Sequence, residues 1–226
     1  MDNKLKNFST LLRKKKDLMI CIFITLILQI IVSIITMKYD QDKNIIGKLS
    51  IKSPLLTGIG IFCTPIIILI AIMYSKSFLI KQILFGLFSI VFGLILSKTI
   101  HTINDPKLVK SAAYSTLINF ILMFILGLII VYLNYDLTWL GSLLFVGLLS
   151  LITVQFIGFF SEHSDQYYKN ISYITVILFS LYILYDTNKI LFKFQNKNKD
   201  HCINGAMEYY LDILNLFTNY LNIDKN

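Results

Sequence analysis

The chain of 226 residues is 56% apolar and only 15% charged, and its mean hydropathy is +0.69. Soluble domains carry about 25% charged residues, so this composition excludes a fold around one water-soluble core and indicates a polytopic membrane protein. The net charge of +8 comes from bases at the ends and in the loops of the chain. Bases in such places orient a membrane protein and meet anionic headgroups, so we expect membrane lipid as a partner and no nucleic acid.

Seven apolar segments follow one another along the chain, each close to the ~20 residues that cross a bilayer core as a helix. Continuous runs of this length fit helices and not the shorter, alternating strands of a barrel. The predicted fold class is therefore all-α, a seven-transmembrane helix bundle in a single membrane domain over residues 1–226. The predicted spans are 18–37, 55–74, 78–97, 113–133, 138–160, 171–192 and 202–221.

The first span follows a basic N-terminal segment, residues 1–17, which ends in the cluster RKKK at 13–16. The span has no small-x-small cleavage site, so we interpret it as a signal anchor with a cytosolic amino terminus. After it, residues 40–52 look like a linker. In the third span, Gly86 and Gly93 lie on one face and should permit close helix packing.

The three cysteines, Cys21, Cys63 and Cys202, lie in or beside separate apolar runs. Their odd number and lack of metal-ligand spacing argue against a disulfide framework or a zinc site, so we expect small buried side chains. The sequence also shows no nucleophile–base pair, metal cluster or phosphate loop. We therefore expect neither an enzyme nor a bound cofactor.

The last two spans each contain a carboxylate, Asp186 in the sixth and Asp212 in the seventh. An ionised carboxylate at membrane depth costs roughly 2.5 to 3.5 kcal/mol, so two of them suggest a functional site. At 1.5 Å per residue they lie roughly 9 and 15 Å from the membrane edge that the two spans share. Antiparallel helices can thus bring them to a similar depth.

Polar residues recur around Asp212 at spacings of three and four, which places them on one face of a helix. They are Gly205, Glu208, Asp212, Asn215 and Asn219. This face cannot contact lipid, so we expect a central carboxy-terminal helix that the other helices surround, or one that lines a wet cavity. Alternatively, the asparagines simply form hydrogen bonds with neighbouring helices.

Two carboxylates in proximity cannot both ionise at low cost, so Asp186 and Asp212 should share a proton near neutrality. When a rise in pH removes this proton, the dianion must separate, bind a cation or admit water. Neighbouring oxygen ligands would suit Ca²⁺, a hard cation. The sequence predicts a proton-sensing ion pathway at Asp186 and Asp212, which bind calcium transiently, with Glu208, Asn215, Tyr182 and Asn219 in supporting positions.

Two strings at these residues, LFSLYILYDT at 178–187 and AMEYYLDILNLF at 206–217, resemble the carboxy-terminal signatures of the Bax inhibitor-1 family; weaker echoes occur at 111–116 and 139–145. The family includes Golgi anti-apoptotic and bacterial branches, and the composition hints at a viral or parasite homologue. The resemblance implies a pH-sensitive calcium leak that lowers store calcium and suppresses cell death. It also implies an ER or Golgi membrane, with the plasma membrane as the alternative.

On the family pattern, Asp186 and Asp212 match its paired aspartates, but the chain departs from that pattern at two other positions. The second span, 55–74, lacks the basic residue that often pairs with the sixth-span aspartate in this family. Phe92 stands where the family has an acidic residue before a glycine. Two other functions remain open: an interaction protein that modulates membrane cell-death regulators without conducting ions, and a proton-coupled transporter.

Overall fold

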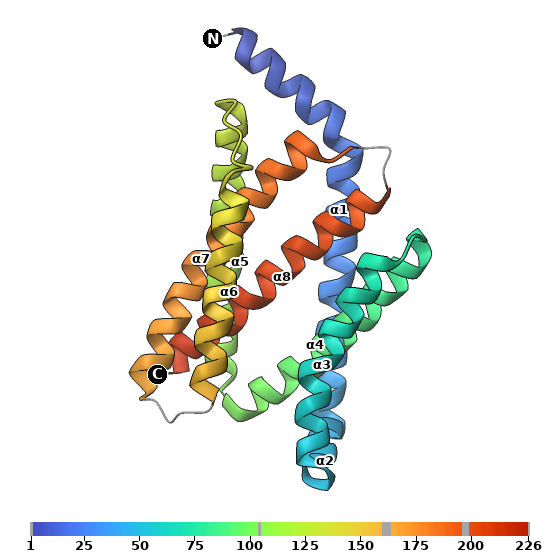
Figure 1. The fold of residues 1–226 in the computed structure, drawn as a ribbon, viewed down its shortest axis with the longest axis vertical. Coiled ribbons are helices and arrows are strands. Elements are labelled where there is room, and N and C mark those ends of the chain that lie inside the picture. The colour runs from blue at the N-terminus through green and yellow to red at the C-terminus, as the bar shows by residue number, and fades with distance from the viewer. Residues whose placement is uncertain (1, 104, 160–163, 196–198, 226) are drawn as a thin grey trace. The chain divides into compact units, whose positions relative to one another are not determined.

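The computed structural model describes residues 2–103, 105–159, 164–195 and 199–225, and within them the regular structure is entirely helical. The all-α prediction is thus confirmed. Figure 1 shows the helices in chain order: α1 (Asp2–Lys43), α2 (Ile45–Lys52), α3 (Pro54–Tyr74), α4 (Phe78–Ile103), α5 (Pro106–Tyr132), α6 (Leu140–Phe159), α7 (Asp165–Lys193) and α8 (Lys199–Lys225).

Each predicted span coincides with one helix, but the helices differ from the predicted set in number and in polarity. Among the described residues, five helices are long and apolar enough to cross a membrane: α1, α4, α5, α6 and α7. α3 contributes a shorter apolar run, Cys63–Tyr74, and the many polar residues of α8 keep it out of this group. The described chain has eight helices, so seven crossings and a central last helix stay predictions. Phe160, the predicted end of the fifth span, lies outside the described residues.

The prediction of a linker over 40–52 is wrong. α1 continues to Lys43, and after Asn44 the chain starts the short helix α2. Asn44 adopts the left-handed conformation, with φ 51°. Asp40 is buried, and its Oδ1 accepts a hydrogen bond from the backbone N–H of Ile46 at 3.1 Å. A single left-handed residue and a side-chain cap therefore redirect a helical chain here.

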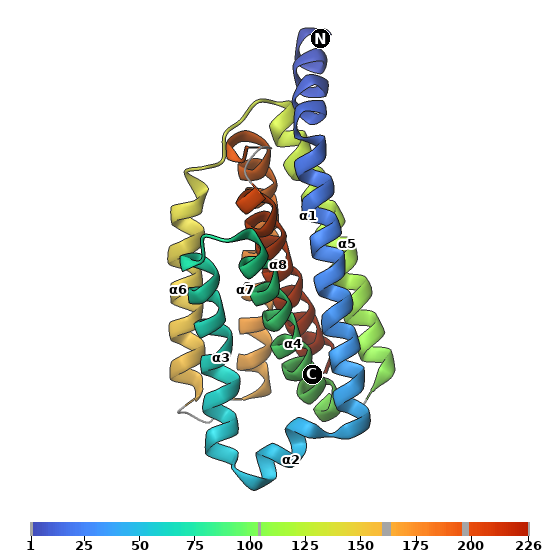
Figure 2. The ribbon, with the colours of Figure 1, turned by 90° about the vertical axis from the view of Figure 1, so that its right-hand side faces the viewer.

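The chain divides into two compact units, each described by itself. The first consists of Met1–Met19, Pro106–His201 and Glu208–Asn226, and the second of Ile20–Asp105 and Cys202–Met207. Within the first, α7 packs against α5 and α6; within the second, α3 packs against α2 and α4 (Figures 1 and 2). α1 and α8 contribute residues to both units. The single membrane domain stays a prediction.

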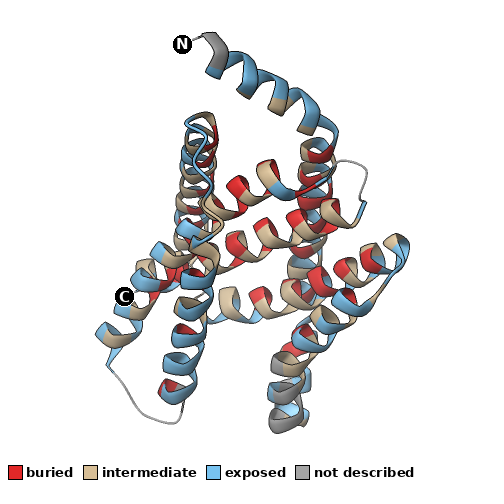
Figure 3. Ribbon diagram, turned by 45° about the horizontal axis from the view of Figure 1, so that its top comes forward, coloured by how far each residue is buried: buried red, intermediate tan, exposed pale blue. Residues whose placement is uncertain are grey.

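Many large apolar side chains remain exposed along these helices, where Figure 3 alternates exposed and buried positions. On α6 alone, the exposed set includes Leu143, Phe145, Val146, Leu149, Ile152 and Phe156. A water-soluble chain rarely exposes apolar surface on this scale, because burying such surface is the main source of folding free energy. The protein is therefore an integral membrane protein whose helices contact lipid.

Two of the three cysteines form a disulfide within the second unit, so the prediction of separate apolar side chains is wrong for this pair. Cys21 in α1 and Cys202 in α8 lie with their Cα atoms 5.8 Å apart, whereas Cys63 is free. The two partners are 181 residues apart in sequence. Spacing rules cover local motifs, so they could not identify a pair that only the tertiary fold brings together.

α4 approaches α1 closely at Gly93, also within the second unit. A Cβ atom at this position would lie 2.6 Å from the carbonyl oxygen of Ser33 and 2.8 Å from Cβ of Thr36. At Gly86 a Cβ atom would meet nothing within 4 Å. Close packing is thus confirmed at Gly93 and wrong at Gly86, because two crossing helices touch over a limited length only.

Replacing Gly93 with alanine should lower the thermal midpoint of the purified protein in detergent, because the new methyl group clashes with the α1 backbone. We expect a loss of about 1 to 3 kcal/mol, the usual cost of overpacking. Gly86→Ala is the matched control, and it should leave the midpoint unchanged or raise it slightly, since alanine favours the helix. An equal loss in both variants would show that α4 does not touch α1 at Gly93.

Candidate functional site

Asp186 and Asp212 both lie in the first unit, on α7 and α8, and each is only 3% exposed. Ser164 caps the amino-terminal end of α7, where its side-chain oxygen accepts a hydrogen bond from the backbone N–H of Tyr167. Asp165 in its first turn and Lys193 in its last complement the helix dipole. These local signals fix the ends of the helix that holds Asp186 near its carboxy-terminal end.

A lysine lies between carboxylates of the two helices. Lys189 Nζ is 3.4 Å from Oδ1 of Asp186, one turn earlier on α7, and 2.6 Å from Oε1 of Glu208 on α8. The same ammonium lies 5.4 Å from the ring centre of Tyr185 and 5.5 Å from that of Phe194. The aromatic rings therefore add cation–π attraction to an ion pair that joins α7 to α8.

Sequence reasoning missed Lys189, although its spacing of three residues from Asp186 is the usual signal for a pair on one helix face. The family resemblance implies that the basic partner of Asp186 lies in the second span. The structure supplies a positive partner for Asp186 from its own helix instead. The spacing could have suggested that contact, but not the contact with Glu208, which requires the packing of α8 on α7.

Asp212 is buried without full hydrogen bonding. Its Oδ2 atom has no hydrogen-bond partner within the described chain, and the same holds for Oε2 of Glu208. Asp212 lies within electrostatic range of Asp186, Glu208 and Lys189. Full ionisation would put three carboxylates against one ammonium, which is costly where water is scarce. Protons or a bound cation would offset the excess negative charge.

Packing around the cluster holds α7 in place. The hydroxyl oxygens of Thr187 and Tyr209 lie 2.8 Å apart, in hydrogen-bonding contact. The ring of Tyr209 is fully buried and meets Phe120 of α5 edge-on at 5.3 Å. At Gly127 of α5, a Cβ atom would lie 2.8 Å from Cβ of Thr187. Because Thr187 follows Asp186 directly, these contacts fix the depth of the carboxylate.

The turn between α5 and α6 is tied to the same end of α7. Asn188 donates a hydrogen bond to the carbonyl oxygen of Tyr135 at 2.8 Å, and its Oδ1 accepts one from the backbone N–H of Leu137 at 3.0 Å. In this turn the backbone N–H of Thr138 donates to Asp136 at 2.8 Å, which lowers the pKa of that carboxyl below its usual value. Asp136 thus stays ionised and the turn stays closed at neutral pH.

The remaining predicted site residues lie along the same two helices, outside the ion cluster. Tyr182 is half-buried one turn before Asp186, and its ring packs against Phe179 at 5.7 Å. Asn215 and Asn219 follow Asp212 by one and two turns of α8 and line a separate pocket. The structure therefore brings Asp186, Glu208 and Asp212 together, and leaves the two asparagines further along the stripe.

Calcium binding at the two aspartates stays a prediction. Within the described residues, no group of three or more His, Cys, Asp or Glu side chains is arranged to hold a metal ion. Any calcium bound at Asp186 and Asp212 would need further oxygen ligands from water or from the backbone, because the ion takes 6 to 8 of them. Such binding would be transient.

Long apolar helices that hold buried aspartates beside a lysine–glutamate pair define a class, the helical membrane proteins with a charged site inside the helix packing. The sequence model of one such family, described as "Inhibitor of apoptosis-promoting Bax1", matches residues 15–224. The chain therefore belongs to the Bax inhibitor-1 family, which confirms the resemblance seen in its last two spans.

Individual relatives come from bacteria and plants. The chain is 39% identical to an uncharacterized protein of Campylobacter jejuni over 88 residues. These residues make up 39% of this chain and 36% of the relative. It is 33% identical over 93 residues to Protein LIFEGUARD 1 of Arabidopsis thaliana, 41% of this chain and 38% of that protein. Protein LIFEGUARD 4 of the same plant is 25% identical over 166 residues, 73% of this chain and 66% of the relative. The matches to the first two thus span little more than a third of each relative.

Proposed function

We propose that this protein is a pH-sensitive, calcium-permeable leak channel of the Bax inhibitor type, which lowers store calcium and suppresses cell death in a eukaryotic setting. The observation that carries the proposal is the cluster in which the buried Asp186 and Asp212 lie with the partly exposed pair Lys189 and Glu208. Buried ionisable groups at membrane depth typically mark ion or proton pathways. In this proposal Asp212, whose Oδ2 has no partner among the described residues, receives the permeating ion.

The ion pair of Lys189 with Glu208 also supplies a gate, because it is the charged link between α7 and α8. Protonation of Glu208 or Asp186 removes the negative charge that holds Lys189. The link is therefore present when the carboxylates are ionised and is lost as pH falls. Two aspartates alone would separate at high pH, so they would give the opposite pH dependence. With the Lys189 link included, we expect the leak to increase as the pH falls.

Calcium flux in liposomes that contain the purified protein tests this proposal. Wild-type flux should be higher at about pH 5 than at about pH 8, because burial generally raises the pKa of a carboxyl from about 4 toward this interval. Asp212→Asn should lower the flux about fivefold, equivalent to about 1 kcal/mol, since an amide cannot carry the charge that attracts the ion.

Asp165→Asn is the matched control, since it removes an exposed carboxylate from the first turn of α7. It should leave both the flux and its pH dependence unchanged. If Asp212→Asn kept wild-type flux at every pH, the ion pathway would have to lie elsewhere.

We further propose that α1 and α3 to α8 all cross the membrane, with the amino terminus in the cytosol and α8 surrounded by the other helices. The coincidence of each predicted span with one helix supports this topology. The ER or Golgi membrane is the proposed location, with the plasma membrane as the alternative. Cysteine-accessibility labelling from the two sides of sealed vesicles would decide the orientation.

The family description favours a second candidate function, an interaction protein that modulates cell-death regulators without conducting ions. This function would use helix contacts in the membrane, so it predicts that the double variant Asp186→Asn, Asp212→Asn still suppresses cell death. The leak predicts that the same variant loses suppression together with flux. A cell-death assay run beside the flux assay separates the two functions.

A further inference from the structure

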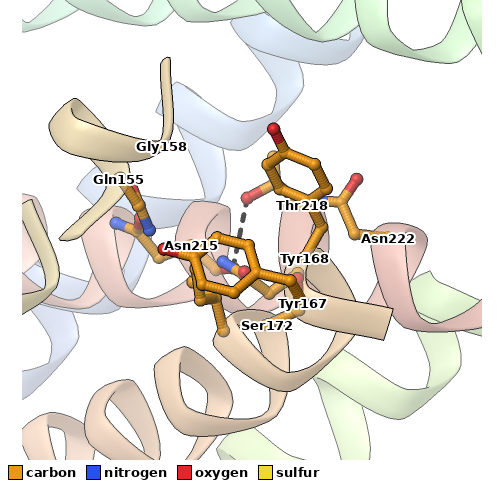
Figure 4. A pocket seen from close by; sticks show the side chains of 10 residues that line it. Gln155, Gly158, Tyr167, Tyr168, Ser172, Asn215, Thr218 and Asn222 are labelled. Atoms are coloured by element: carbon orange, nitrogen blue, oxygen red, sulfur yellow. Dashed lines mark hydrogen bonds between the residues drawn. The ribbon is translucent and has the colours of Figure 1, made fainter. Parts of the chain in front are cut away.

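A polar pocket lies in the first unit, away from the ion cluster. It has a volume of about 380 Å³, and α6, α7 and α8 all contribute to its wall (Figure 4). No charged side chain occurs among its described lining residues, although most of them are polar. The polar set includes Gln155, Tyr167, Ser172, Asn215, Thr218 and Asn219. A neutral, oxygen-rich pocket in a membrane helix bundle requires an explanation, because polar groups there need partners.

Hydrogen bonds fix which atoms of the two asparagines remain as acceptors. The amide nitrogen of Asn215 donates to the carbonyl oxygen of Leu211 at 2.8 Å, and that of Asn219 donates to the carbonyl oxygen of Asn215 at 2.8 Å. Only the NH₂ group of an amide can donate, so neither side chain can be reversed without losing its bond. Each Oδ1 atom is therefore left as an acceptor.

The α8 wall of the pocket is thus a row of acceptor oxygens. Asn215 and Asn219 are four residues apart, which places their side chains one above the other on the helix, about 6 Å apart along its axis. Between them, the hydroxyl of Thr218 donates to the carbonyl oxygen of Leu214 at 2.9 Å, so its proton also points back to the backbone. These acceptor oxygens can bind a cation, while each amide also keeps a second N–H beside the bond that it donates.

The chemistry of these oxygens selects the type of cation. Neutral carbonyl and hydroxyl oxygens are hard ligands, which suit Ca²⁺ and alkali ions and not soft transition metals. With no carboxylate in the lining, the ion keeps part of its water shell and binds weakly. Weak binding is what a conducting path requires, because the ion must also leave.

Two asparagines of the pocket lie on the same face of α8 as Asp212. Asp212, Asn215 and Asn219 follow at spacings of three and four, so the two asparagines lie about 5 and 10 Å from Asp212 along α8. We infer that this pocket is a weak binding site for a partly hydrated calcium ion at the mouth of the path that leads to Asp212. This inference rests on the proposed leak and assigns it an entry site.

Terbium(III), a luminescent substitute for Ca²⁺, tests the site directly, because tyrosines excite it over short distances. Tyr167 and Tyr168 both line the pocket, with ring centres 5.6 Å apart. Tb³⁺ added to the purified full chain in detergent should give saturable, tyrosine-excited emission that Ca²⁺ displaces. The double variant Asn215→Leu, Asn219→Leu should bind Tb³⁺ about tenfold more weakly, since it removes two carbonyl ligands.

Three further variants keep the outcome interpretable. Asn219→Asp should bind Tb³⁺ more tightly than the wild type, a gain that misfolding cannot imitate. Tyr167→Phe with Tyr168→Phe should lose the tyrosine-excited emission, which places the ion beside these rings. Asp186→Asn with Asp212→Asn should keep the emission even if flux is lost, so a failed leak and a failed pocket give different results. Emission that survives the leucine variant unchanged, or that disappears with the aspartates instead, would overturn the inference.

Discussion

Replacing Lys189 with methionine should lower the free energy of unfolding by about 3 kcal/mol, the lower end of the cost of breaking a buried ion pair. The methionine keeps most of the apolar volume of the lysine but leaves Asp186 and Glu208 without their shared cation. The lower end applies because the side chains of Lys189 and Glu208 remain 22% and 25% exposed. The thermal midpoint of the purified protein in detergent would report the loss.

The same variant should change the pH response. Without the ammonium, the ion pair between Lys189 and Glu208 is gone, so protonation of Glu208 has no such link to release. Calcium flux at about pH 8 should rise toward the value at about pH 5, and the ratio between them should approach one. A lower midpoint with an unchanged pH response would mean that the pair stabilises the fold without gating the leak.

Lys193→Met is the matched control for Lys189→Met. Lys193 lies one turn further on the same helix, and its side chain is exposed. The control removes the same charge from α7 but should change the midpoint by no more than about 0.5 kcal/mol, as surface substitutions do. Adding Glu208→Gln to Lys189→Met should recover part of the loss, because it removes one of the carboxylates left unpaired. Strictly additive losses would show that the two side chains do not interact.

The sequence predicted the helices well because long apolar runs leave the backbone in lipid no alternative to a helix. It predicted that Asp186, Glu208 and Asp212 share a region, because helical spacing and helix length fix depth. It could not predict Lys189 as the partner of Glu208, or Cys21 as the partner of Cys202, since both contacts depend on how distant helices pack. The helix α2 was missed because one left-handed residue, Asn44, ends α1 where composition alone resembles a linker.

Replacing Cys202 with serine should destabilise the protein by about 2 to 4 kcal/mol, because the disulfide closes a very long loop and so restricts the unfolded chain. Cys21 and Cys202 are separated by 181 residues. Cys21→Ser should have the same effect, and the two substitutions together should cost no more than one, since either removes the same bond. A thiol reductant should lower the midpoint of the wild type to that of Cys202→Ser.

Cys63→Ser provides the control, because Cys63 is the free cysteine of the described chain and lies on α3. The thermal midpoint of the Cys63→Ser variant should stay near the wild-type value, and it should still fall when a reductant is added. Additive losses in Cys21→Ser and Cys202→Ser would instead indicate that each thiol packs independently and that no bond forms.

The disulfide and the ion pair restrain the same helix at two nearby points. Cys202 ties the first turns of α8 to α1, and Glu208, six residues or about 9 Å further on, ties it to Lys189 of α7. With both restraints in place, movement of the half of α8 that carries Asp212 requires the ion pair to open, along with the contact between Thr187 and Tyr209. Loss of the disulfide should therefore raise the flux of Lys189→Met more than that of the wild type, in which the ion pair still holds the helix.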